Sequence, residues 1–114
     1  MRNSILVYSV LATILIVGCT PSAGKPNANL ECAALINAAS QLSSRGELDT
    51  GAEFDSQALF SGMMHLNTYA IPNQITETEA FEQMNALREA LIKTNSPSRI
   101  LKGAKSCVRK TPQQ

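Results

Sequence analysis

The segment LECAALINAASQLSS, residues 30–44, indicates the fold class of this sequence. Its apolar side chains recur three and four positions apart, so they share one face when the segment is wound as an α-helix. That face consists of Cys32, Leu35, Ile36, Ala39 and Leu42. Gly46 follows closely, and glycine readily takes the left-handed conformation that ends a helix. We therefore predict a helix over residues 30–44 that buries one apolar face.

Three more segments, residues 51–70, 77–94 and 97–110, have the same periodicity. Pro72 is expected to end the second helix, because the residue before a proline avoids the helical conformation. Each helix is preceded by a side chain suited to capping it: Thr50 paired with Glu53, Thr76 paired with Glu79, and Ser96 followed by Pro97. β-branched residues do not alternate as they do in strands.

The apolar positions of these helices predict the core. The second helix is expected to bury Leu59, Met63, Leu66 and Ala70, widened by Phe60, Met64 and Ile71. The third and fourth helices are expected to bury Ala80, Phe81, Met84, Leu87, Leu91, Ile100, Leu101, Ala104, Cys107 and Val108. The sequence thus predicts an all-α fold, a small three- or four-helix bundle over residues 30–110, followed by a frayed tail over residues 111–114.

The first residues have the pattern of an export signal. Arg2 supplies a positive charge, and the apolar run over residues 5–17 is shorter than the roughly 20 residues that a membrane-spanning helix needs. We interpret the run as part of a signal peptide. A short buried helix and an uncleaved anchor are the alternatives.

The residues after this run, Ile16-Val17-Gly18-Cys19, resemble the lipobox of bacterial lipoproteins. The resemblance implies that residues 1–18 are a lipoprotein signal peptide and that Cys19 receives a diacylglyceryl group. It also implies a membrane anchor without a spanning helix, since two or more acyl chains hold a protein stably. Thr20, rather than Asp, follows the cysteine, which favours the outer membrane facing the periplasm. Residues 19–29 would form the lipidated cysteine and a flexible linker rich in Pro, Gly and small polar residues.

If Cys19 carries lipid, Cys32 and Cys107 remain, each on the apolar face of its predicted helix. We expect a disulfide between them, because an exported domain with a small core gains much from a covalent closure. Two unpaired core cysteines are the alternative. There is no Cys-x-x-Cys pair and no histidine beside either cysteine, so we expect neither redox chemistry nor a metal site.

The sequence offers little catalytic chemistry. His65 is the only histidine, and it falls on the polar side of its helix with Gln57, Ser61 and Thr68, as a solvated or interhelical residue would. No serine has a Gly-x-Ser-x-Gly setting, and no glycine-rich phosphate loop is present. The acids Glu77, Glu79 and Glu82 are better explained by the helix dipole. We predict a protein that is not an enzyme and needs no cofactor.

Charge divides the chain into two parts. Residues 31–82 hold eight acids and one base, whereas residues 88–110 hold seven bases and one acid. The fourth predicted helix carries Arg99, Lys102, Lys105, Arg109 and Lys110. Acids on neighbouring helices could neutralise these cations. Alternatively the cations form a face for anionic lipid or an acidic envelope protein. Nucleic acid is not expected, because base-stacking aromatic residues are scarce.

Three functions fit these features. The first is a lipid-anchored envelope protein that acts as a non-catalytic interaction or structural module. The second is a periplasmic stress chaperone or inhibitor. This hypothesis rests only on an analogy with small helical periplasmic proteins that contain one disulfide. The third is a binder of small apolar ligands, with Met63, Met64 and Met84 lining a pocket between helices.

Overall fold

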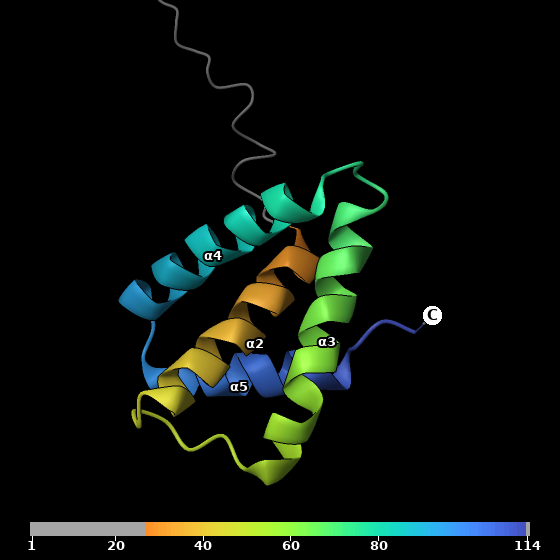
Figure 1. Ribbon diagram of the computed structural model, residues 1–114. Coiled ribbons are helices and arrows are strands. Elements are labelled where there is room, and N and C mark those ends of the chain that lie inside the picture. Colours follow the sequence, from red (N-terminus) through yellow and green to blue (C-terminus); the bar gives the residue numbers. More distant parts are fainter. Residues whose placement is uncertain (1–26, 114) are drawn as a thin grey trace, which may run out of the picture.

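The computed structural model describes residues 27–113, and within them all regular structure is helical. The elements are α2 (Ala28–Ser44), α3 (Ala52–Ala70), α4 (Glu77–Thr94) and α5 (Pro97–Arg109), shown in Figure 1. The predicted all-α class is confirmed, with four helices in the domain. The predicted signal peptide and Cys19 lie outside the described residues.

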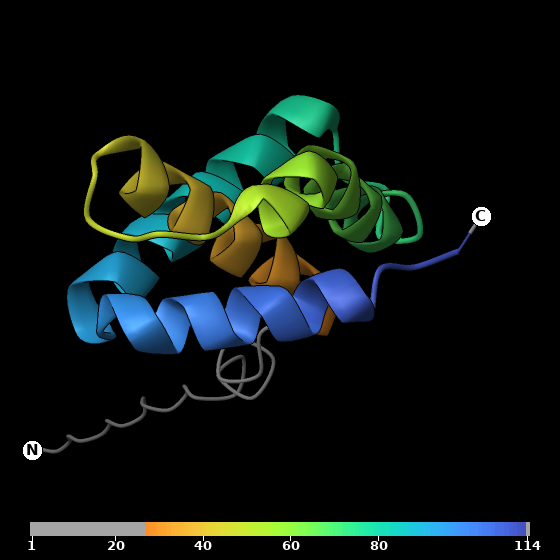
Figure 2. The ribbon, with the colours of Figure 1, turned by 90° about the horizontal axis from the view of Figure 1, so that it is seen from below.

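Helix α2 is the centre of the domain. It packs extensively against α3, α4 and α5, whereas those three touch one another much less. Figure 2 shows α5 along one side of α2 and α3 on the other. The sequence explains this role, because Ala33, Ala34, Ala38 and Ala39 are all fully buried on α2. Side chains this small let neighbouring helices approach from several directions.

The core consists of two apolar clusters along α2. One lies where α2 meets α5 and the first half of α3, and its buried members include Ile36, Leu42, Phe54, Ile100 and Ala104. The other lies where α2 meets the end of α3 and the start of α4, and its buried members are Ala33, Ala34, Leu66, Ala70, Ala80 and Met84. On α5 the predicted positions Ile100, Ala104 and Cys107 are indeed buried.

Helix α5 comes unusually close to α2 at Gly103. A Cβ atom built on this residue would lie 3.1 Å from Leu35 Cδ1, which is tighter than ordinary van der Waals contact. A side chain at position 103 would therefore require Leu35 to shift by a few tenths of an ångström.

Two of the expected caps form as predicted. The Thr76 hydroxyl accepts a hydrogen bond from the Glu79 amide, and the Ser96 hydroxyl accepts one from the Arg99 amide. Gly46 ends the turn after α2 with φ +77°. Helix α2 begins two residues earlier than expected, because the Asn27 side chain accepts hydrogen bonds from the backbone amides of residues 29 and 30.

The expected capping box of Thr50 and Glu53 does not form. Gly51 is the N-cap of α3, with φ +88° and no side-chain cap. Thr50 is buried, and its hydroxyl donates to Asp55 Oδ1 at 2.5 Å. The Thr50 side chain is therefore buried and does not cap α3. Gly51 occupies the N-cap position.

The predicted inner face of α3 is partly wrong. Leu59, Phe60 and Ile71 are 77%, 65% and 72% exposed, and Met63 is also exposed. The buried face runs instead through Phe54, Ala58, Ser61, Met64, His65, Leu66 and Ala70. Compared with the prediction, α3 is rotated about its own axis. Ser61 and His65 are therefore buried, and both side chains make hydrogen bonds there. On α4, Phe81 is likewise exposed although it was expected in the core.

A disulfide joins Cys32 in α2 to Cys107 in α5, with 5.3 Å between the Cα atoms. It closes 75 positions of chain, and so it links the start of the first helix to the end of the last. This confirms the predicted pairing and excludes two unpaired core cysteines.

Replacing both cysteines by alanine should lower the free energy of unfolding by about 4 kcal/mol, since a closed loop of this length strongly restricts the unfolded chain. Urea unfolding followed by circular dichroism measures the change, and the wild-type chain with and without reductant is the control. A loss below about 1 kcal/mol would show that the helices hold without the bond.

Candidate functional site

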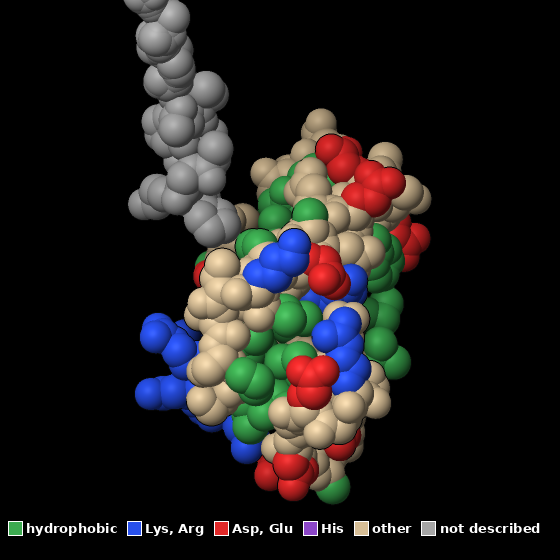
Figure 3. Space-filling view, turned by 90° about the vertical axis from the view of Figure 1, so that its left-hand side faces the viewer, with side chains coloured by type: hydrophobic (Ala, Val, Ile, Leu, Met, Phe, Trp, Pro, Cys, Tyr) green, Lys and Arg blue, Asp and Glu red, His purple; other side chains and the backbone are tan. Residues whose placement is uncertain are grey.

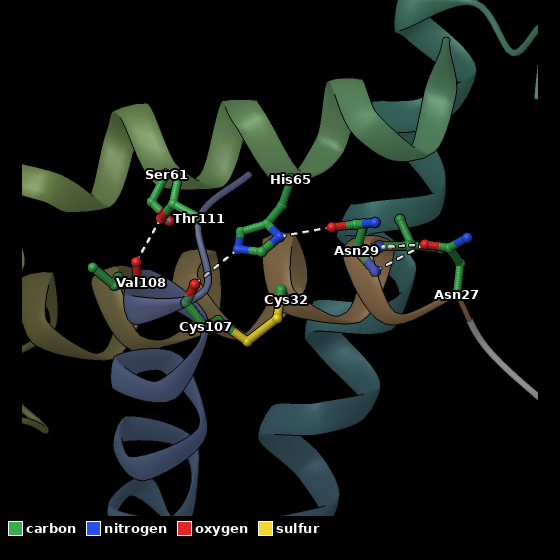
Figure 4. The surroundings of a disulfide bond; sticks show 9 residues. Asn27, Asn29, Cys32, Ser61, His65, Cys107, Val108 and Thr111 are labelled. Atoms are coloured by element: carbon green, nitrogen blue, oxygen red, sulfur yellow. Dashed lines mark hydrogen bonds between the residues drawn. A yellow bond between two sulfur atoms is a disulfide. The ribbon is translucent and has the colours of Figure 1, made fainter. Parts of the chain in front are cut away.

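His65 joins three helices at the disulfide end of the domain (Figure 4). The side chain comes from α3 and is 2% exposed. Its Nδ1 lies 2.9 Å from Asn29 Oδ1 on α2, and its Nε2 lies 2.8 Å from the carbonyl oxygen of Cys107 on α5. A carbonyl oxygen can only accept a hydrogen bond, so the N–H at Nε2 is the donor. Asn29 can present its oxygen to a protonated Nδ1 or, after rotation of the amide, its NH₂ to an unprotonated one.

A second polar contact lies one turn away. Thr111 Oγ1 donates to the Val108 carbonyl at 2.6 Å and lies 2.5 Å from Ser61 Oγ. Because the Thr111 proton goes to Val108, Ser61 donates to Thr111. The start of the expected frayed tail is therefore bound to α3.

These contacts give His65 an interhelical role, one of the two that the sequence allowed. Its ring nitrogens are occupied by an amide and a backbone carbonyl, and Ser61 bonds to Thr111. A catalytic histidine needs a nucleophile within hydrogen-bond reach. Within residues 27–113 none bonds to this ring, so the cluster links α2, α3 and α5.

An apolar groove lies on the other side of α2, between α3 and α4. These two helices diverge from the turn that connects them (Figure 1), and α2 forms the floor between them. The groove has a volume of about 370 Å³. Its floor and walls include Ala33, Ile36, Ala58, Gly62 and Leu66, and its rims include Leu59, Met63, Phe81 and Met84.

Two of the three methionines that were predicted to line a pocket do line this groove. Met63 and Met84 line it, whereas Met64 is buried and does not. Asp55, Asn37 and Ser40 are its polar lining. The exposed side chains of Leu59, Met63 and Phe81 therefore belong to one surface feature, whereas Phe60 and Ile71 are exposed outside it.

The cations of α5 lie on its outward side. Arg99, Lys102, Lys105, Arg109 and Lys110 are all exposed, and we call them the cationic face. Helix α5 contains no acid. In the part of the chain that the structure describes, the one ion pair joins Arg88 to Glu89. Ion pairs to neighbouring helices therefore do not neutralise the cationic face.

The space-filling view shows the same separation of charge. In Figure 3, Lys and Arg side chains project from the left-hand edge, on the side of α5, while Asp and Glu gather at the top right and along the bottom. Other Lys and Arg side chains lie beside acids in the middle of the view, and Arg88 pairs with Glu89 on α4, so the separation of charge holds for the cationic face and not for the whole basic block.

Residues 27–113 contain neither a metal cluster nor a membrane-spanning helix. This part of the chain contains no group of three or more His, Cys, Asp or Glu side chains placed to hold a metal ion. None of its helices is both long and apolar enough to cross a membrane. Cys19, the predicted lipid site, lies outside the described residues.

Comparisons of the chain with family models, with curated proteins and with solved structures found no match.

The sequence allowed a pocket between helices at Met63 and Met84, but the burial of His65 was missed because the wrong face of α3 was placed inside. A signal was present, because Ser61 and His65 are one turn apart and continue the line of Phe54 and Ala58. The small residues Ala58 and Gly62 also mark where α3 leaves room beside α2.

Replacing His65 by leucine should lower the free energy of unfolding by about 1–2 kcal/mol, since Asn29 loses its ring partner and the buried Cys107 carbonyl keeps only the Lys110 amide. Urea unfolding measures the loss. Thr68→Ala on the exposed side of α3 is the control, with an expected change below about 0.5 kcal/mol. Equal stability of the two variants would contradict the role assigned to His65.

Proposed function

We propose that this chain is a lipid-anchored bacterial envelope protein whose helical domain is a non-catalytic interaction module. The anchor rests on the lipobox-like residues 16–19 and on the signal-like segment before them. The interaction role rests on the groove between α3 and α4, which combines an apolar lining with exposed apolar rims.

The occupant that fits the groove is an apolar segment of another envelope protein. Leu59 is 77% exposed on the rim, so a small molecule in the groove would leave this side chain in water. A longer segment can cover Leu59, Met63 and Phe81 together, which removes apolar surface from water. A helix laid along such a groove is a recurrent mode of peptide recognition.

The acidic residues in and around the groove favour a partner segment that carries positive charge. Asp55 lies in the groove lining, and residues 31–82, which include most of α2, all of α3 and the start of α4, hold eight acids and one base. A segment with Lys or Arg beside its apolar face would complement this surface and would be steered towards it.

A small apolar ligand is the second candidate. A volume of about 370 Å³ falls within the range of ligand pockets, and Met63 and Met84 give the lining adaptable side chains.

Mass spectrometry of the membrane-extracted protein tests the anchor. We expect a chain that begins at Cys19 and carries acyl chains on that residue, and we expect Cys19→Ser to release the protein from the membrane fraction. A chain that keeps residues 1–18, or an unmodified Cys19, would refute the anchor and leave the groove to be judged separately.

Site-specific photo-crosslinking in intact cells tests the groove. A photoreactive residue at Leu59 should give one defined protein adduct, and Met63→Asp should remove it because a buried carboxylate opposes apolar docking. The same label at Phe60 is the matched control, since Phe60 is exposed on α3 but does not line the groove. Ser56→Asp, exposed on the same helix, controls for the added charge.

Each alternative outcome contradicts the proposed occupant. Equal adducts from Leu59 and Phe60 would indicate unspecific encounter. An adduct of twice the mass of the chain would assign the groove to a second copy. A co-purified apolar compound that Met63→Asp removes, without a protein adduct, would favour the ligand-binding candidate.

A further inference from the structure

We propose that the cationic face of α5 lies on a membrane surface that bears anionic phospholipid headgroups, and that this contact fixes the orientation of the domain. The proposal rests on the proposed function in one respect: the lipid on Cys19 supplies the membrane. The binding face itself is read from the described residues.

The arrangement of α5 is the first argument. Ile100, Ala104 and Cys107 are buried against the domain, and the cations occupy the opposite side of the same helix. Since α5 has no acid and its cations make no ion pair within residues 27–113, the positive field of this face is directed outward. A helix with one apolar and one basic side is typical of segments that lie on anionic membranes, but here the domain already covers the apolar side. The interaction between α5 and an anionic membrane would therefore be electrostatic.

The position of the tether is the second argument. The described chain begins at Asn27, which caps α2. The disulfide Cys32–Cys107 fixes this end of α2 to the end of α5, and His65 bridges Asn29 to the Cys107 carbonyl. Arg109 and Lys110 lie two and three residues after Cys107. The tether therefore enters the domain beside the cationic face.

The length of the tether is the third argument. Eight peptide units separate Cys19 from Asn27. A chain of that length spans at most about 28 Å when fully extended. A lipid on Cys19 therefore holds Asn27 within this distance of the headgroups. Confinement of this kind gives even a weak surface contact a high effective concentration.

The distribution of acids is the fourth argument. Acids gather away from the cationic face, at the upper right and along the bottom of Figure 3, although Glu53 of α3 lines the same cleft as Lys105 and Arg109. An anionic surface attracts α5 and repels the acidic side, so the two effects favour the same orientation. That orientation turns the groove between α3 and α4 away from the lipid, because α2 separates the groove from α5 (Figure 2).

Vesicle sedimentation of the mature chain, residues 19–114 with Cys19→Ser, tests the face without help from the anchor. The vesicles are equal parts phosphatidylethanolamine and phosphatidylglycerol, with phosphatidylcholine as the neutral comparison. We expect binding to the anionic vesicles alone, weakened by salt because exposed charges are screened. The double variant Lys102→Glu, Arg109→Glu should bind at least about twentyfold more weakly, since each cation near such a surface strengthens binding about fivefold.

The matched control is Arg45→Glu, Lys93→Glu. It makes the same change in net charge at two exposed positions outside the cationic face, the C-cap of α2 and the last turn of α4. This variant should bind within about twofold of wild type, because neither residue belongs to the proposed contact. All substituted residues are exposed, and circular dichroism with an intact disulfide verifies the fold of each variant.

Two results would overturn the proposal. Equal weakening by both double variants would show that net charge alone attracts the chain. Absence of binding to anionic vesicles would exclude the lipid surface and leave an acidic protein as the partner of α5. Because the tested chain carries no lipid, neither result bears on whether Cys19 is the anchor.

Discussion

The packing of small side chains along α2 is the constraint on which the domain depends. Alanines at positions 33, 34, 38 and 39 are fully buried, and they let three other helices lie against one. A central helix with larger side chains would hold its neighbours further apart and would leave voids between them. The cost is a small apolar core, divided into two clusters. The Cys32–Cys107 bond offsets that cost by restricting the unfolded chain.

The same constraint creates the two surfaces of interest. Since α2 carries the packing, α3 and α4 need not pair along their lengths, and their divergence opens a groove over Ala33 and Ile36. Helix α5 contacts α2 with one side and little else, so its opposite side is free to carry cations. An apolar surface and a basic surface thus lie on different sides of one central helix.

Sequence patterns predicted the helices and the disulfide well, because both depend on local features. The Thr76 and Ser96 caps and the periodic faces of α4 and α5 are readable without knowledge of neighbours. Helix α3 is different. Its apolar side chains cover more than one face, and its inner side is chosen by the partners that Asn29, Cys107 and Thr111 offer to Ser61 and His65. Those partners are distant in sequence, so the apolar pattern of α3 alone did not determine which of its faces is buried. The cationic residues were predicted, but their lack of ion pairs was not.

The position of the disulfide also has a mechanical consequence. It lies five residues after Asn27 and a few residues before the end of the chain, so the long stretch from Cys32 to Cys107 is a closed loop. A tension applied between the two ends of the chain passes through the sulfur–sulfur bond and bypasses this loop. Helices α3 and α4 and the groove between them then carry none of the load. The domain can therefore be pulled from both ends without unfolding of the groove, as long as the bond stays oxidised.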